Sequence, residues 1–229
     1  MGGCNSMQRI FDILFAGLAL LILVFPFLII MLILRLTGEG EIFYIQQRIG
    51  KDGIPFGVFK FATMRKNSSK IGTGTVTVKN DPRVLPIGRF LRKAKINELP
   101  QLVNVLAGSM SVIGPRPQTQ RCFDAFPKEL QTVISSVRPG LSGVGSVAFR
   151  DEEAMMHEAE NANKFYDYEI MPYKGALEVW YARNRNLGTY FGLIGLTVWV
   201  VFTGNTSALY SLYKSLPHPP NTLRKFIRV

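Results

Sequence analysis

The feature that most constrains this chain is a run of 22 residues without a charged side chain, from Ile13 to Leu34. A helix rises about 1.5 Å per residue, so a helix of this length is long enough to cross the hydrocarbon core of a membrane. Pro26 lies near the middle of the run, where a proline removes a backbone donor and clashes with the preceding turn. The run predicts either a spanning helix with ends on opposite sides or a helix broken at Pro26 that enters and leaves by one face.

The charges that flank the apolar run favour the second shape. Cations stand on both sides of it: Arg9 before the run, and Arg35, Arg48 and Lys51 after it. Because cationic flanks stay on the cytoplasmic side of a membrane, this arrangement predicts a re-entrant helix over residues 9–36. A plain single span is the alternative. Residues 1–8 are predicted to be a disordered start.

Composition limits the class of protein. The 229 residues are 47% hydrophobic and carry a formal charge of +11, which suits one domain with a core, a membrane anchor and an anionic partner. The apolar run favours a membrane surface or phosphorylated molecules over nucleic acid, for which the sequence shows no recognisable binding motif. The two cysteines, Cys4 and Cys122, imply no disulfide framework and fit a reducing compartment.

The rest of the chain predicts a small, mostly helical α/β (α+β) domain over residues 37–213, followed by a basic C-terminal tail over 214–229. Aromatic and alternating patterns predict strands at 41–47 and 56–64, followed by a polar loop at 66–83. Helices are expected at 86–95, 97–106, 127–135 and 152–170, and a Gly-rich, then strand-like, segment at 138–149. The apolar segment 190–202 is expected to lie in or just under a membrane surface, with a buried core helix as the alternative.

The segment Ile96–Pro117 carries the clearest chemistry. Its carboxylate, Glu98, follows a cluster of cations made of Arg89, Arg92, Lys93 and Lys95. The turn Gly114–Pro117 holds Arg116 between two prolines, so its guanidinium would be presented rigidly for bidentate phosphate binding. One carboxylate for Mg²⁺ among cations for phosphate oxygens is the composition of a metal-diphosphate site. A basic surface helix followed by a turn is the alternative.

With these residues in view, the sequence resembles the bacterial sugar transferases of the monotopic polyprenyl-phosphate phosphoglycosyl transferase family. The resemblance extends from Arg9 to about Phe202. The motifs that carry it are Arg9-Ile10-Phe11-Asp12, Pro26, Lys60-Phe61-Ala62-Thr63-Met64, Asp81-Pro82-Arg83, Glu98-Leu99-Pro100-Gln101-Leu102, Asn104-Val105-Leu106, Gly108, Met110-Ser111, Gly114-Pro115-Arg116-Pro117 and Arg138-Pro139-Gly140.

The resemblance implies a re-entrant helix broken at Pro26 and amphipathic helices on the cytoplasmic leaflet of the bacterial inner membrane, whose lipids are expected partners. It implies transfer of a sugar 1-phosphate from a UDP-sugar to undecaprenyl phosphate with release of UMP, and Mg²⁺ as cofactor. Such a step would begin the assembly of an exopolysaccharide, capsule, O-antigen or glycoprotein glycan. The sugar is not indicated, and a homodimer is left open.

One departure from the family pattern concerns the catalytic pair. In the usual members an adjacent Asp-Glu pair is catalytic, and the aspartate attacks the sugar-bearing phosphorus. Asn97 stands at the aspartate position here, and a carboxamide is a poor nucleophile. Either Glu98 is the nucleophile while Asn97 positions a phosphate oxygen, or the lipid phosphate attacks directly while Glu98 holds Mg²⁺. The third alternative is a catalytically impaired, membrane-anchored adaptor in glycan assembly.

The resemblance also implies roles for Lys60, Arg116, Arg138 and Glu178, while Arg89 and Arg92 come from the cluster of cations before Glu98. Glu98 and Glu178 are expected to contact the metal, with an ordinary helix carboxylate as the alternative for Glu178. Contacts to the substrate phosphates or nucleotide are expected from Lys60, Arg89, Arg92, Arg116 and Arg138.

Overall fold

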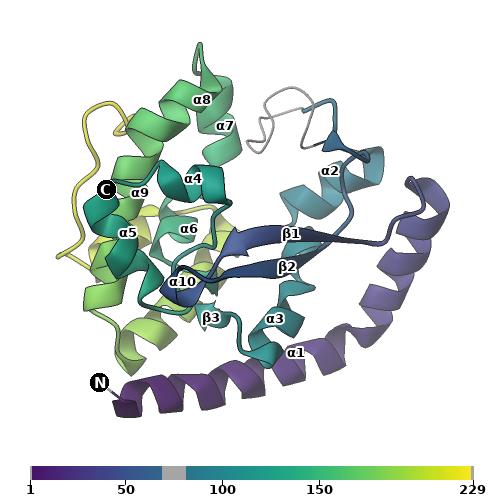
Figure 1. Cartoon of the computed structure of the whole chain (residues 1–229), viewed down its shortest axis with the longest axis horizontal. Helices are drawn as coiled ribbons and strands as arrows, with labels where there is room; N and C mark the ends of the chain where they lie inside the picture. The colour runs from purple at the N-terminus through teal and green to yellow at the C-terminus, as the bar shows by residue number, and fades with distance from the viewer. Residues whose placement is uncertain (1, 69–80, 228–229) are drawn as a thin grey trace.

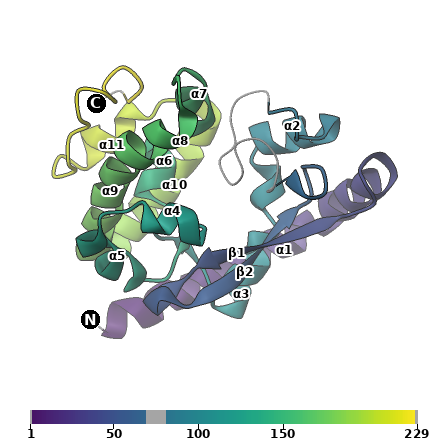
Figure 2. The ribbon, with the colours of Figure 1, turned by 45° about the horizontal axis from the view of Figure 1, so that its top comes forward.

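The computed structural model describes residues 2–68 and 81–227. Figures 1 and 2 show a long N-terminal helix that runs along one side of a body made of a two-stranded ribbon and many short helices. The elements are α1 (Gly2–Thr37), β1 (Phe43–Ile49), η1 (Lys51–Gly53), β2 (Pro55–Phe61), α2 (Pro86–Lys93), η3 (Ile96–Glu98), α3 (Gln101–Ala107), β3 (Ser111–Ile113), α4 (Gln120–Asp124), α5 (Lys128–Ser135), β4 (Gly140–Ser142), α6 (Val144–Ala148), α7 (Glu152–His157), α8 (Ala162–Phe165), η4 (Tyr166–Ile170), α9 (Met171–Arg183), α10 (Leu187–Thr203) and α11 (Ser207–Leu212). This mixture of helices and small sheets confirms the α+β class.

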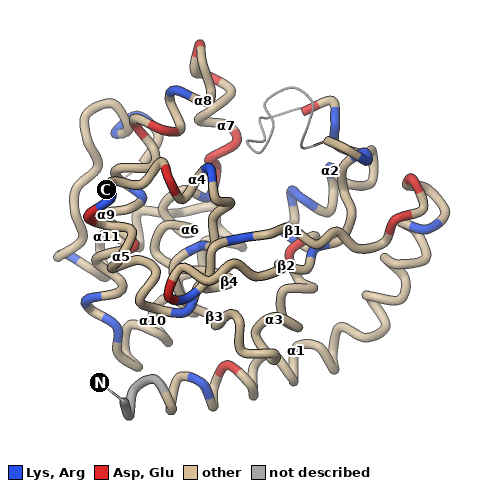
Figure 3. The backbone as a smooth tube through the Cα atoms, viewed as in Figure 1, with Lys and Arg blue, Asp and Glu red and all other residues tan. Residues whose placement is uncertain are grey.

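Helix α1 is continuous through Pro26 and curves along its length (Figure 1). It is therefore one helix without a break at the proline, and its curvature turns its C-terminal end back toward the body (Figure 1). Residues 2–8, predicted to be disordered, form its first turns. Figure 3 shows charged residues near both ends of α1 and none along its middle.

One face of α1 packs on the body near both of its ends. In the first half, Asp12 and Ala16 are buried, and the Asp12 carboxylate accepts hydrogen bonds from Val112 N and from the Ser111 and Tyr190 hydroxyls. In the second half, Leu34 is buried with Phe61 and Leu91. The opposite face exposes large apolar side chains: Leu14, Leu18, Leu21, Ile22, Phe25, Leu28, Ile29, Leu32 and Leu36.

Strands β1 and β2 form an antiparallel hairpin that confirms both predicted strands. Its register runs from Phe43 opposite Phe61 to Ile49 opposite Pro55. The connecting turn takes left-handed backbone angles at Asp52 and Gly53, two residue types that tolerate them. Successive side chains of a strand point to opposite faces, so the burial of Phe61 beneath β2 directs its neighbour Lys60 to the other face.

Strands β3 and β4 form a second, parallel pair, with Ser111 opposite Gly140 and Ile113 opposite Ser142. The two backbones come so close that a Cβ atom at Gly140 would lie 2.0 Å from the Gly114 nitrogen. This glycine therefore allows the turn 114–117 to pack directly against the segment that carries Arg138. The predicted strand-like end of 138–149 is wrong: after the short β4, residues 144–148 form helix α6.

The C-terminal half packs around α9, where Met171, Leu177 and Tyr181 are buried. The predicted single helix at 152–170 is divided into α7, α8 and the π-helical turn η4. Residues 214–227, predicted to be part of a basic tail, belong to this packed half. The buried side chains of Leu223 and Ile227 fix them there.

The hydrogen bonds to Asp12 yield a stability prediction. Asp12→Ala leaves three donors, two of them buried, without their acceptor, so we expect the free energy of unfolding to fall by about 3 kcal/mol. Urea unfolding in detergent micelles measures the change. Asp124→Ala is the matched control, because that side chain is exposed at the end of α4. Equal stability of the two variants would contradict the structural role of Asp12.

Candidate active site

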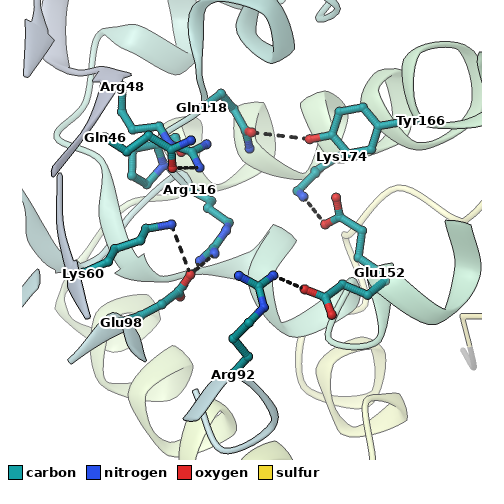
Figure 4. Close-up of polar contacts among 12 residues, drawn as sticks. Gln46, Arg48, Lys60, Arg92, Glu98, Arg116, Gln118, Glu152, Tyr166 and Lys174 are labelled. Atoms are coloured by element: carbon teal, nitrogen blue, oxygen red, sulfur yellow. Dashed lines mark hydrogen bonds and ion pairs between the residues drawn. The ribbon is translucent and has the colours of Figure 1, made fainter. Parts of the chain in front are cut away.

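Basic side chains from several elements lie around one carboxylate, Glu98, and two of them, Lys60 and Arg116, contact it (Figure 4). The 3-10 turn η3 positions Glu98 after Lys95, whose left-handed backbone reverses the chain at the end of α2. The hairpin contributes two cations, and α2 and the turn after β3 contribute one each. The members are Arg48 of β1, Lys60 of β2, Arg92 of α2, Glu98 of η3 and Arg116 of the turn 114–117. The structure thus brings together Lys60, Arg92, Glu98 and Arg116 as predicted.

Both carboxylate oxygens of Glu98 contact cations. The Arg116 guanidinium donates from Nη1 to Glu98 Oε2 at 3.0 Å and from Nη2 to Oε1, and Lys60 Nζ lies 3.6 Å from Oε1. Burial raises the pKa of Glu98, but the charges of Arg116 and Lys60 outweigh burial and hold this pKa well below its ordinary value. Glu98 is therefore ionised at neutral pH.

The cations around Glu98 lie close enough together to repel one another and lower each other's pKa values. Burial and the charge of Arg48 lower the pKa of Lys60 to about 7, against the opposing effect of Glu98. Burial also lowers the pKa of Arg48, and Arg116 adds to this effect. A single carboxylate does not neutralise this group. A bound anion with several oxygens, such as a diphosphate, would relieve the repulsion and accept bidentate hydrogen bonds.

Two ion pairs from the helical half complete the surroundings of the site (Figure 4). Arg92 donates to Glu153 Oε1 at 2.5 Å, and Lys174 donates to Glu152 Oε2 at 2.5 Å. The two glutamates open α7, as the sequence predicted for them. They connect α2 and α9 through α7, so the helical half of the protein is tied to the cluster around Glu98.

Two predicted phosphate contacts lie elsewhere. Arg89 is exposed on α2 and, within the described residues, makes no ion pair. Arg138 lines a separate small pocket beside the first turns of α1, together with Gln8, Asp12, Ser111, Tyr181 and Arg185. Val137 and Pro139, on either side of Arg138, line a different pocket. Neighbouring side chains of an extended segment point to opposite sides, so Arg138 points away from that pocket.

Asn97 and Glu178 are buried polar groups next to this site. Asn97 is 5% exposed, and within the described part of the chain its Oδ1 has no hydrogen-bond partner. Glu178 is 1% exposed, its Oε1 accepts the Arg116 backbone N–H at 3.3 Å, and its Oε2 likewise has no partner there. Burial raises the pKa of Glu178 to about 7.

The described residues contain no group of three or more His, Cys, Asp or Glu side chains that could hold a metal ion. Mg²⁺ usually takes one or two carboxylates and completes its shell with water and substrate phosphates, so the ionised Glu98 fits the role of a single protein ligand. Glu178 contacts the main chain of Arg116, whereas Glu98 contacts the end of its side chain. The two predicted metal ligands thus meet opposite ends of one arginine.

Several residues around the site were not predicted from the sequence. For Arg48 a signal existed, because Gln46 and Arg48 are two residues apart on one strand and share a face, and Gln46 Oε1 accepts from Arg48 Nη2 at 2.6 Å. For Lys174 the spacing of four to Glu178 places both on one face of α9. No local pattern predicts the partners Glu152 and Glu153, which come from another helix.

The comparison with known proteins identifies the family of this chain. The bacterial sugar transferase family matches residues 4–204, which is most of the chain. The chain belongs to this family, as its motifs predicted.

Three relatives of this chain carry names that state an activity or a process. Over 166 residues the chain is 35% identical to the exopolysaccharide production protein ExoY of Sinorhizobium fredii, covering 66% of this chain and 72% of that protein. Over 171 residues it is 33% identical to the UDP-glucose:undecaprenyl-phosphate glucose-1-phosphate transferase of Escherichia coli, covering 72% of this chain and 36% of that longer protein. It is 37% identical over 142 residues to the UDP-N-acetylgalactosamine-undecaprenyl-phosphate N-acetylgalactosaminephosphotransferase of Aeromonas hydrophila, covering 61% and 33%.

The environment of Lys60 yields a prediction about its titration. Acylation of a lysine requires the neutral amine, so labelling of Lys60 should increase with pH through a midpoint near 7. Because Glu98 raises the pKa of Lys60, Glu98→Gln should move the midpoint to lower pH. Mass spectrometry of the labelled peptide measures both midpoints. A midpoint near the ordinary value of 10.5, unchanged in the variant, would contradict this picture of the site.

Proposed function

We propose that this protein transfers a sugar 1-phosphate from a UDP-sugar to undecaprenyl phosphate and releases UMP. The observation that carries the proposal is the ionised Glu98 held by Arg116 and Lys60 within an excess of cations. Relatives of this chain are named as transferases that join these two kinds of substrate. Their names, and that of ExoY, support a place at the first membrane step of glycan or exopolysaccharide assembly.

The cations around Glu98 supply binding and charge neutralisation. A UDP-sugar carries two phosphates, whose oxygens would accept hydrogen bonds from the Arg116 guanidinium and the Lys60 ammonium. When the phosphates take over these donors, the carboxylate of Glu98 is released toward the sugar-bearing phosphorus. Phosphoryl transfer depends mainly on positioning and on stabilising charge, and both come from this group of side chains.

Mg²⁺ is part of the proposal as a cofactor. Glu98 would hold it together with substrate phosphate oxygens, and the ion would supply Lewis-acid stabilisation of the charge on the phosphates. Asn97 brings no charge, so the proposal assigns Glu98 the direct role at the reaction centre. The buried Oδ1 atom of Asn97 would accept a hydrogen bond and so orient a neighbouring donor.

We further propose that α1 is a re-entrant membrane helix and that the body lies on the cytoplasmic face of the bacterial inner membrane. Helix α1 is long and apolar enough to cross a membrane, and only 6% of its apolar 18-residue segment is buried against the rest of the protein. Asp12 near its start and Leu34 near its end both pack on the same body, which supports entry and exit on one side. Exposed Trp199 and Phe202 on α10 support a second contact with the lipid surface.

A transfer assay tests the function. Purified protein, a radiolabelled UDP-sugar, undecaprenyl phosphate and Mg²⁺ should give label in the lipid phase. Glu98→Gln should lower the rate by roughly a thousandfold, because it removes the charged group of the reaction centre. Glu129→Gln, on the exposed side of α5, is the control and should retain the rate.

The outcomes separate the alternatives. Full transfer by Glu98→Gln would contradict the role of that carboxylate, and failure of the unaltered protein with every UDP-sugar in a panel would favour an adaptor. A phosphosugar adduct on the protein, detected by intact mass before lipid is added, identifies a two-step route through Glu98. Active transfer without such an adduct identifies direct attack by the lipid phosphate.

A further inference from the structure

The turn that presents Arg116 is supported from behind by the buried carboxylate of Glu178. Glu178 lies on α9, and its Oε1 accepts the backbone N–H of Arg116, 62 residues away in the sequence. A buried carboxylate is costly unless it is paired or hydrogen-bonded, and this one is 1% exposed. Glu178 therefore holds the main chain of Arg116 at a substantial cost in desolvation.

The helix opposite Glu178 leaves room for its carboxylate. A Cβ atom at Gly145 of α6 would lie 2.4 Å from Glu178 Oε1 and 3.3 Å from Lys174 Cγ. Gly145 lies inside a helix, where alanine would be the better helix former. The absence of a side chain at Gly145 therefore leaves the space that the Glu178 carboxylate occupies.

A second residue of α9 reaches the same site. Lys174 lies one turn before Glu178, its side chain is 2% exposed, and its Nζ pairs with Glu152. The adjacent Glu153 pairs with Arg92 (Figure 4). Helix α9 thus supports two sides of the site, directly at Arg116 and indirectly at Arg92.

We propose that Glu178 is a positioning residue that fixes the main chain at Arg116, so that the guanidinium is aimed at the phosphate site beside Glu98. This inference rests on the proposed function and deepens it. It differs from the metal-ligand role that the family resemblance implies, because Glu178 Oε1 is engaged by the Arg116 backbone. Burial raises the pKa of Glu178 to about 7, which agrees with a carboxyl group enclosed by protein.

The position of Arg116 matters because a guanidinium binds phosphate through two parallel N–H groups, and a small misplacement loses both bonds. Loss of the Glu178 contact should therefore weaken the binding of the UDP-sugar diphosphate. A ligand of Mg²⁺ would behave differently, since its loss raises the metal concentration that the enzyme requires.

Three variants and a control test this role. Glu178→Gln keeps an oxygen that accepts the Arg116 N–H, Glu178→Leu removes it, and Gly145→Ala displaces the carboxylate without altering it. Gly195→Ala is the control, because a Cβ atom at this glycine of α10 would meet nothing within 4 Å. Thermal unfolding of each variant confirms folding, and the Gln and Ala variants carry the test should the Leu variant unfold.

The readouts are KM for the UDP-sugar, kcat, and the Mg²⁺ concentration for half-maximal activity. We expect Glu178→Leu and Gly145→Ala to raise KM by roughly tenfold to a hundredfold, with the Mg²⁺ requirement unchanged. Glu178→Gln and Gly195→Ala should stay within about twofold of the unaltered protein. A raised Mg²⁺ requirement in Glu178→Gln, or an unchanged KM in Gly145→Ala, would overturn the inference. An unaltered protein that is itself inactive would instead refute the proposed function.

Discussion

The pairing of Glu98 with Arg116 is the interaction on which the candidate site depends. It joins the turn η3 to the turn 114–117 and places a negative charge beside Lys60 and Arg116 (Figure 4). The charges of Arg116 and Lys60 act strongly on the buried Glu98, because they hold its pKa well below its ordinary value. In the absence of substrate the carboxylate partly neutralises these cations, and phosphate oxygens can replace it.

The rest of the fold places this cluster between two structural supports. The hairpin β1–β2 directs Lys60 away from the buried Phe61, while α9 holds the main chain of Arg116 through Glu178. Helix α1 packs under the hairpin and under β3, so the site is built above the same helix that exposes an apolar face.

Local sequence patterns were sufficient for the features that depend on neighbouring residues. The uncharged run identified α1, alternation identified the hairpin, and the short segment from Glu98 to Arg116 identified the centre of the site. Contacts between distant segments were not predictable in this way. The pairing of Lys174 with Glu152, the packing of Leu223 and the direction of Arg138 each depend on how separate helices or loops meet. Whether Pro26 breaks the helix or leaves it continuous and curved, as here (Figure 1), depends on the packing around it and is not fixed by the sequence.

The central claim is that the cations around Glu98 bind the diphosphate of the donor. The most direct measurement is a structure of the protein with a bound UDP-sugar. The account predicts phosphate oxygens within about 3 Å of the Arg116 guanidinium and the Lys60 ammonium, with Glu98 released from Arg116. A diphosphate bound elsewhere, with the contact between Glu98 and Arg116 intact, would contradict it.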